Sequence, residues 1–488
     1  MARNNCDYTV LDYLRNLCCN GCSTLHRRFY ASGRLALSTE QTTLVFGLGV
    51  AGMAVANALC KRGDTVILAD DENTKQHQDF ARGLNCEFVN TTDETAVMSV
   101  LKRINRLAPA PGIPEGHHVM RVARQMGLSI SSELELAYNF EELREGGPRP
   151  MLGITGTDGK TTTTLMTAAM LRAAGYQSMA VGNTETPLVA ALDTDAQVFA
   201  VECSSFRLSN CEHFRTSASV WLNLAPDHLD WHTNMESYTA AKAQLWAHSR
   251  AGDVAVAPVD DARILKFAQE STARIVTFGA IEGDYHAQDG RLNSPHGSIM
   301  NISEMKRALP HDITNALAAT AISIESGLVE PSDVARALSE FDNAPHRIEF
   351  VEIIDGVKWF NDSKATSPHA SAVAIKSFQN IVLIAGGRNK GLDLAELASQ
   401  PQRVRAVVAI GDDANEIEKA FDGVCRVVHG ESMKEAVRLA RTLAVHGDVV
   451  LLSPACTSYD WYNNYMERGE DFMQCVRNEA NLNQQHSE

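Results

Sequence analysis

The chain has 488 residues, 44% of them hydrophobic, and a formal net charge of −16. The length exceeds one ordinary domain and predicts about three, and the composition is typical of a soluble globular protein. No apolar run approaches the roughly 20 residues that span a bilayer, and no basic stripe is present. These features argue against membrane insertion and against nucleic acid as a partner.

The first 40 residues have no long apolar segment of the kind found in secretory signals and hold four of the eleven cysteines. Cys18, Cys19, Cys22 and His26 could in principle bind Zn²⁺, but their spacing matches no paired knuckle. The other cysteines are scattered, which indicates reduced thiols and a cytoplasmic protein. We expect residues 1–40 to be a disordered extension.

The first predicted domain covers residues 41–147. An apolar strand at Thr42–Phe46 precedes a Gly-x-Gly-x-x-Gly turn, a helical run to Lys61 and a second strand, Asp64–Ala69. This βαβ order is typical of a dinucleotide site. The ligand is either NAD or another nucleotide diphosphate held at the helix N-terminus. Candidate binding residues are Gly47, Gly49, Val50, Ala51, Gly52, Asp70 and the turn residues Pro111 and Gly112.

Gly146-Gly147-Pro148 predicts a linker to a second domain, residues 148–343. Its phosphate loop runs from an apolar stretch into a helical run, Thr161–Ala174, and comprises Gly156, Thr157, Asp158, Gly159, Lys160, Thr161 and Thr162. A standard Walker A loop would have Gly where Ile154 stands. Lys160 suits the terminal phosphates of a nucleotide, and the Thr161 hydroxyl suits Mg²⁺.

Apolar segments at Ser178–Val181, Gln197–Glu202 and Ser219–Leu224 alternate with helical runs, so we expect a parallel α/β sheet. Glu202 ends the second of these strands, near the phosphate loop. A carboxylate there suits a Mg²⁺ ligand, and the alternative is an acid that caps a helix.

Two further candidates follow the third strand of this domain. His228 lies in a dense polar segment and is either a metal or phosphate ligand or a structural histidine. Lys242 lies in an Ala-rich helical run and is either a site residue or a surface lysine with a buried stem.

The third predicted domain covers residues 344–488. Asp355-Gly356 predicts a hairpin between strands Glu349–Ile354 and Val357–Phe360. Three further strands, Ile381–Ala385, Ala406–Ile410 and Val449–Leu452, predict a small doubly wound unit. Polar loops follow three strands of this domain, at residues 361–366, 386–391 and 453–458. In an open α/β sheet, loops at this edge bind the ligand.

The ordered set of motifs over residues 42–478 resembles the Mur ligases of peptidoglycan synthesis. The motifs are the short Gly156-Thr-Asp-Gly-Lys-Thr loop, Glu202-Cys-Ser-Ser-Phe, Asp227-His228, Ala241-Lys242 and Pro345-His-Arg347. The segments Asn361–Thr366, Ser453–Asp460 and Glu467–Phe472 resemble the branch that adds D-glutamate.

The resemblance implies a three-domain α/β ligase, with a Rossmann-like domain for the UDP substrate, a central P-loop-like ATPase domain and a Rossmann-like amino-acid domain. ATP would phosphorylate the carboxylate of UDP-N-acetylmuramoyl-L-alanine, and the amine of D-glutamate would attack the acyl phosphate. The products would be an amide, ADP and phosphate. The resemblance also implies two Mg²⁺ ions and a monomer.

The resemblance assigns roles to individual positions. Lys160, His228, Lys242, Arg347 and Lys364 would be catalytic. Thr161, Glu202, His228 and Lys242, the last as a CO₂-derived carbamate, would hold the metals. ATP would also contact Asn315, Arg347 and Asp362. The UDP substrate would also reach Asn183, Ser204 and Arg207, and D-glutamate would contact Thr366, Lys390, Ser458, Tyr459 and Tyr465.

The sequence departs from the family pattern at several positions. Asp312 stands where an asparagine contacts the nucleotide, Arg207 replaces a glutamine, and Asp71 and Glu72 follow Asp70. Three alternatives remain at this point: an NAD-dependent dehydrogenase, another Mur-type or folylpolyglutamate-type ligase, and a non-catalytic nucleotide-binding scaffold.

Overall fold

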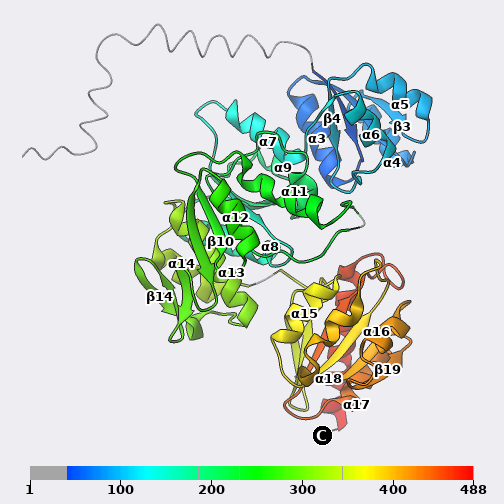
Figure 1. Cartoon of the computed structure of the whole chain (residues 1–488). Coiled ribbons are helices and arrows are strands. Elements are labelled where there is room, and N and C mark those ends of the chain that lie inside the picture. The colour runs from blue at the N-terminus through cyan, green and yellow to red at the C-terminus, as the bar shows by residue number, and fades with distance from the viewer. Residues whose placement is uncertain (1–40, 185, 230, 343, 487–488) are drawn as a thin grey trace, which may run out of the picture.

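The computed structural model describes residues 41–486 apart from 185, 230 and 343. The expected disordered extension and the zinc alternative at Cys18, Cys19, Cys22 and His26 therefore lie outside the described residues. The described chain forms three α/β units, each built on a mostly parallel sheet, as Figure 1 shows. This confirms the predicted fold class.

The first sheet has the parallel strand order β3-β2-β1-β4-β5. This order places the end of β1 at the point where the chain switches direction across the sheet, the usual ligand position in such folds. The elements are β1 (Thr42–Phe46), α3 (Val50–Lys61), β2 (Thr65–Asp70), α4 (Lys75–Gly83), β3 (Glu87–Asn90), α5 (Glu94–Leu101), β4 (Arg106–Pro109), α6 (His118–Gln125), β5 (Ser129–Ile130) and α7 (Glu133–Glu142).

The second sheet has nine strands in the order β14-β13-β12-β11-β10-β9-β6-β8-β7 and is parallel except at β13 and β14. The strand predicted at Ser219–Leu224 is wrong at its end, because the chain leaves the sheet after Trp221. The first elements are β6 (Met151–Thr155), α8 (Lys160–Ala173), β7 (Ser178–Gly182), α9 (Leu188–Ala191), β8 (Val198–Glu202), α10 (Ser205–Leu208), β9 (Ala218–Trp221) and α11 (Met235–Ala247). The others are β10 (Val254–Pro258), α12 (Ala262–Glu270), β11 (Arg274–Gly279), β12 (Tyr285–Gln288), β13 (Arg291–Ser294), β14 (Gly297–Asn301), η2 (Ile302–Glu304), α13 (Pro310–Glu325) and α14 (Pro331–Glu340).

The third sheet has the order β15-β16-β20-β17-β18-β19, in which only β15 is antiparallel. The hairpin predicted at Asp355-Gly356 is confirmed, and both residues have positive φ, as a type I′ turn requires. The elements are β15 (Glu349–Ile354), β16 (Val357–Asn361), α15 (Pro368–Lys376), β17 (Ile381–Gly386), η3 (Leu394–Ser399), η4 (Pro401–Arg403), β18 (Val404–Ile410), α16 (Ala414–Ala420), β19 (Arg426–Gly430), α17 (Met433–Leu443), β20 (Val449–Ala455) and α18 (Tyr465–His486).

One hydrophobic core joins the first two units. It runs from Val45 and Leu68 of the first sheet, through Leu134 of α7, to Val181 and Trp221 of the second sheet. The third unit instead builds its two cores almost entirely from residues after 347. The chain therefore packs as two joined units and one that depends on its own core.

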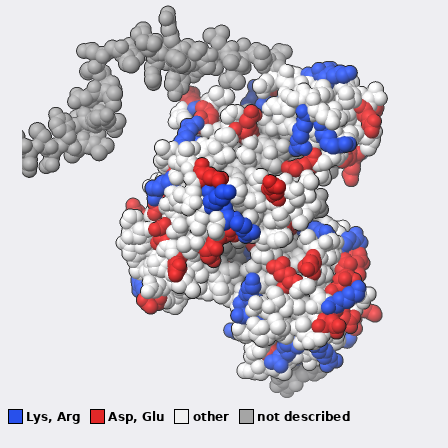
Figure 2. Space-filling model, viewed as in Figure 1, with Lys and Arg blue, Asp and Glu red and all other residues white. Residues whose placement is uncertain are grey.

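The surface carries both signs of charge. On the face in Figure 2, Lys and Arg are interspersed with Asp and Glu over all three units. Among the described helices, none is both long enough and apolar enough to cross a bilayer.

Candidate active site

The glycine turn after β1 is shaped for close approach of a ligand. A Cβ on Gly52 would lie 1.8 Å from the carbonyl oxygen of Gly47, so only glycine lets α3 pack on this turn. A Cβ on Gly49 would meet nothing within 4 Å, and no side chain caps the α3 N-terminus there. The helix end can therefore receive an anion such as a pyrophosphate.

Asp70 supports this turn from the end of β2. Its Oδ2 accepts a hydrogen bond from the Leu48 amide at 2.6 Å, and its Oδ1 accepts one from the Glu72 amide at 2.9 Å. The carboxylate thus already holds the backbone of the glycine turn.

The phosphate loop is held in place by Asn223. The Asn223 Oδ1 accepts hydrogen bonds from the amides of Thr157 and Asp158, both at 2.9 Å, and its Nδ2 donates to the Asp158 carbonyl at 3.2 Å. Lys160 folds back over the loop and donates to the carbonyls of Gly156 at 2.9 Å and Thr157 at 2.6 Å. The loop is therefore shaped without a nucleotide.

Gly159 forms the N-terminal cap of α8 in the left-handed region, with φ +79°. A Cβ there would lie 2.4 Å from the Asn315 side-chain oxygen of α13. Glycine therefore brings the start of α8 close to Asn315, as expected if both contact one ligand.

Glu202 ends β8 and is 2% exposed. Its Oε1 accepts a hydrogen bond from Asn183 Nδ2 at 3.1 Å, whereas its buried Oε2 has no hydrogen-bond partner. A buried carboxylate oxygen without a donor is costly unless a cation binds it. This favours the metal-ligand interpretation over the capping one, because oxygen donors are what Mg²⁺ prefers.

His228 lies in the loop after β9 and has a positive φ of 54°. Its Nε2 is 3.3 Å from Asp227 Oδ2, and its ring packs on Phe206 at 4.6 Å between centroids. Burial, opposed by Asp227 and assisted by Lys160, lowers the pKa of His228 to about 4. The imidazole is therefore neutral at pH 7, the form that ligates metals.

Lys242 is positioned by α11, which begins with a capping box between Asn234 and Ser237. The side chain is 1% exposed, so Lys242 is not a surface lysine. Its Nζ donates to the Gly156 carbonyl at 2.6 Å and lies 4.5 Å from the Tyr238 ring centroid. Burial first, and then Lys160, lowers the pKa of Lys242 well below its usual value.

A cavity of about 320 Å³ is lined by residues of both the central unit and the third unit. Many of the predicted site residues line it: Asp158, Gly159, Thr162, His228, Asn315, Arg347, Asp362, Lys364, Thr366 and Lys390. The phosphate loop thus faces the polar loops of the third sheet across one space.

Arg347 enters this cavity from the linker between the two units. Its neighbours His346 and Ile348 have φ values of +62° and +44°, which is strained for a β-branched residue such as Ile348. The Arg347 Nε is buried without a hydrogen-bond partner. The guanidinium is therefore placed to bind an anion.

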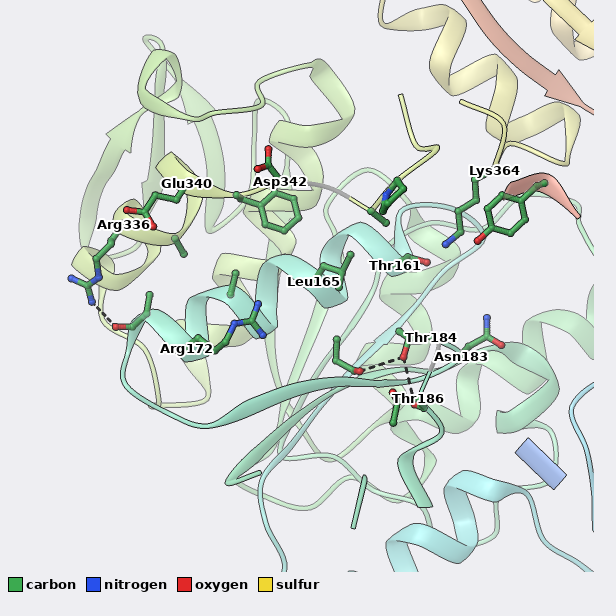
Figure 3. Close-up of a pocket in the computed structure, with 18 residues that line it drawn as sticks. Thr161, Leu165, Arg172, Asn183, Thr184, Thr186, Arg336, Glu340, Asp342 and Lys364 are labelled. Carbon is green, nitrogen blue, oxygen red and sulfur yellow. Dashed lines mark hydrogen bonds between the residues drawn. The ribbon is translucent and has the colours of Figure 1, made fainter. Parts of the chain in front are cut away.

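A second, larger cavity of about 1,010 Å³ runs along α8. Figure 3 shows Thr161, Asn183 and Lys364 toward one end and Arg172 and Arg336 toward the other. The end with Thr161 and Asn183 therefore adjoins the start of α8 and includes a residue predicted to contact the UDP substrate.

The residues that the resemblance assigns to D-glutamate binding differ in their exposure and in whether they line a cavity. Lys364 Nζ lies 5.6 Å from the Tyr465 ring centroid, and both residues line the larger cavity. Ser458 is buried, whereas Tyr459 is 65% exposed. Tyr459 is thus the predicted amino-acid contact that this structure supports least.

Asp362, predicted at the ATP ribose, already has protein partners. Its Oδ1 accepts from the Ile348 amide at 3.2 Å and its Oδ2 from the Ser453 hydroxyl at 2.8 Å. Burial raises the pKa of Asp362 to about 7, although Ser453 and Arg347 oppose this. Asp362 therefore ties the linker to the third unit.

Two departures from the family pattern have structural explanations. Arg207 is buried in an ion pair with Glu133 at 3.2 Å and donates to Asn183 at 2.5 Å, so its charge is compensated within the protein. Asp312 is fully buried, where it accepts a hydrogen bond from the Leu309 amide at 3.3 Å at the start of α13. Its neighbours His311 and Asn315, but not Asp312, line the smaller cavity.

Two residues of this region were missed as site candidates by sequence reasoning. His369 of α15 contacts Asp158 of the phosphate loop, and no local pattern marks this long-range pair. Asn223 lies in a polar segment after β9 that the sequence did reveal, but its contact with the loop depends on the sheet order.

Comparison with known proteins identifies relatives over nearly the whole chain. Residues 154–323 match the Mur ligase middle domain and residues 346–456 match the Mur ligase glutamate ligase domain. A UDP-N-acetylmuramoylalanine–D-glutamate ligase of Pelotomaculum thermopropionicum is 34% identical over 451 residues, covering 90% of this chain and 98% of the relative. One of Frankia casuarinae is 37% identical over 459 residues, covering 89% and 93%.

Among solved structures, the MurF ligase of Thermotoga maritima in complex with ADP aligns with a TM-score of 0.57 at 15% identity, covering 91% of this chain and 96% of that one. At this identity the likeness concerns the fold alone.

Proposed function

This chain belongs to the Mur ligase family, and we propose that it joins D-glutamate to UDP-N-acetylmuramoyl-L-alanine using ATP. The observation that best supports this is the smaller cavity, where the phosphate loop faces the polar loops of the third unit. A ligation through an acyl phosphate needs a nucleotide and an amino acid at such a meeting point. We choose these two substrates because both relatives described above are named UDP-N-acetylmuramoylalanine–D-glutamate ligases.

The first step brings two anions together, because the alanyl carboxylate attacks the terminal phosphorus of ATP. Lys160 and Arg347 are the cations that would reduce this repulsion. Lys160 would exchange its present contacts with Gly156 and Thr157 for phosphate oxygens. Arg347 would contribute its unpartnered Nε from the linker.

Two Mg²⁺ ions would take their ligands from these residues. Thr161 and Glu202 would hold one, and the unpartnered Oε2 of Glu202 supports this assignment. His228 and a carbamate on Lys242 would hold the other. When bound, the ions would neutralise charge on the triphosphate and on the acyl phosphate.

Lys242 suits carbamate formation because CO₂ reacts only with a neutral amine, and the product is a carbamate plus a proton. An ordinary lysine has about one neutral amine in a thousand near pH 7.4. The lowered pKa of Lys242 raises this fraction. The buried position beside Gly156 would also place the new carboxylate at the phosphate loop.

In the second step the amine of D-glutamate would attack the acyl carbon and expel phosphate. Lys364, Thr366, Lys390, Ser458 and Tyr465 are the proposed contacts for its two carboxylates. In the first unit, the glycine turn before α3 would hold the pyrophosphate of the UDP substrate. Asn183 and Ser204 would lie nearer the reacting end of that substrate.

Phosphate release in the presence of ATP and each combination of UDP-muramoyl acceptor and amino acid tests this proposal. We expect release with UDP-N-acetylmuramoyl-L-alanine and D-glutamate, with a product whose mass is greater by one glutamyl residue. The Lys160→Ala variant serves as the inactive control. Comparable rates with L-glutamate, or release only with another acceptor, would contradict the assignment.

A further inference from the structure

Arg468 of α18 is a buried cation within the third unit. It is 1% exposed, and its guanidinium forms no direct ion pair with a carboxylate among the described residues. Burial lowers the pKa of Arg468 to about 10, although the nearby carboxylate of Asp460 opposes this, so the group stays charged at neutral pH. Burying an arginine without a directly paired acid is costly, so its hydrogen bonds to the protein must replace the lost contacts with water.

The guanidinium of Arg468 joins two loops. Its Nε and Nη2 donate to the hydroxyl and carbonyl of Ser363 at 3.0 and 2.9 Å. Its Nη1 donates to the carbonyls of Cys456 and Thr457 at 3.1 and 3.2 Å. These loops follow β16 and β20, which are neighbours in the third sheet.

The loop after β17 is tied to the same position. The Arg388 amide donates to the Thr457 carbonyl at 3.0 Å, and the Thr457 amide returns a hydrogen bond to Arg388 at 2.9 Å. A Cβ on Gly387 would lie 2.2 Å from the Thr457 carbonyl oxygen, so the two loops are in close contact. The guanidinium therefore holds two of the polar loops directly, and the third loop is held to them through the Thr457 backbone.

The next residue of α18 contacts the linker. A Cβ on Gly469 would lie 2.2 Å from Nδ1 of His346, which directly precedes Arg347. The same turn of α18 thus supports both the polar loops and the segment that carries Arg347.

We propose that Arg468 is a positioning residue for an amino-dicarboxylic substrate. By fixing the spacing of the loops after β16 and β20, it sets the distance between Lys364 and Thr366 on one loop and Ser458 on the other. A rigid fork suits this role, because its three nitrogens make four hydrogen bonds to the two loops, whereas a lysine ammonium has three donors on a single nitrogen. This inference rests on the proposed function, which assigns the amino acid to these loops.

The test compares Arg468→Lys, Ser363→Ala and the control Arg477→Lys, which changes an exposed arginine on the same helix. Apparent KM values are measured for the amino acid, the UDP substrate and MgATP, and folding is checked by circular dichroism. We expect Arg468→Lys to raise the KM for D-glutamate about tenfold or more, with the other two KM values changed less than about twofold. Ser363→Ala should show the same selectivity with a smaller effect, and the control should match the parent.

An unchanged KM for D-glutamate in Arg468→Lys and Ser363→Ala would overturn the inference. So would an equal rise in all three KM values, which indicates general damage. If Arg468→Lys does not fold, Ser363→Ala decides, because it removes one partner and keeps the arginine. If the parent enzyme shows no release with D-glutamate, the proposed function fails instead, and the comparison is made with whichever amino acid supports release.

Discussion

Replacing Asn223 by alanine tests how the phosphate loop is maintained. The substitution removes two hydrogen bonds accepted from loop amides and one donated to a loop carbonyl. At about 1 kcal/mol each, their loss would weaken the bound form of the loop by up to about 3 kcal/mol. Water will replace some of these contacts, so we expect MgATP to bind about 10- to 100-fold more weakly, since 1.4 kcal/mol corresponds to tenfold.

The measurement is the Kd for MgATP by calorimetry, together with the KM for each substrate. Asn293→Ala is the matched control, because the Asn293 side chain donates only to nearby carbonyls of Gln288 and Arg291, and β13 lies next to the edge strand β14, away from β9. The KM for D-glutamate should not change. Unchanged or tighter MgATP binding would refute the reasoning, and tighter binding would mean that Asn223 competes with the nucleotide for the amides of Thr157 and Asp158.

Three further predictions concern other parts of the site. Lys242→Ala should lower kcat about a thousandfold or more and regain part of it in millimolar formate or acetate; parental activity would remove Lys242 from the site. Gly52→Ala should abolish UDP-substrate binding, measured by calorimetry, because the new Cβ would lie 1.8 Å from a Gly47 oxygen; parental affinity would show that the turn can relax. Burial opposes the shift, but Asp158 holds the pKa of His369 above its usual value. The contact therefore stabilises the folded protein at pH values below the pKa that His369 has in the unfolded chain. This stabilisation is lost as the pH rises through the higher pKa of His369 in the folded protein. The thermal stability lost in His369→Gln should therefore be larger at pH 6 than at pH 9, and equal losses would contradict this assignment.

Much of the fold followed from local pattern. The strand Thr42–Phe46 and the end of the following helix at Lys61 were predicted at their observed positions, because a buried strand and a glycine turn are encoded within a few residues. The end of β9 was not, because Leu222, Asn223 and Leu224 alternate apolar and polar residues as a strand does. There the chain turns so that Asn223 can reach a loop 65 residues earlier.

The site was predictable as a set of motifs but not as a set of contacts. The sequence left two interpretations of Lys242, a site residue or a surface lysine, since its helix is apolar on several sides. Its burial is decided by the packing of α11 against β6 and β9. Arg207 was expected at the substrate, and its pairing with Glu133, 74 residues away, could not be inferred from its neighbours.

The continuous core between the first two units also determines where the protein can be divided. A chimera joined at Gly146-Gly147 would pair a foreign central unit with α7, leaving Leu134 and its neighbours against a surface that did not evolve with them. A junction at the linker before Arg347 would cut across little apolar packing. We therefore expect exchange of the third unit between relatives to give folded hybrids more readily than exchange of the first unit.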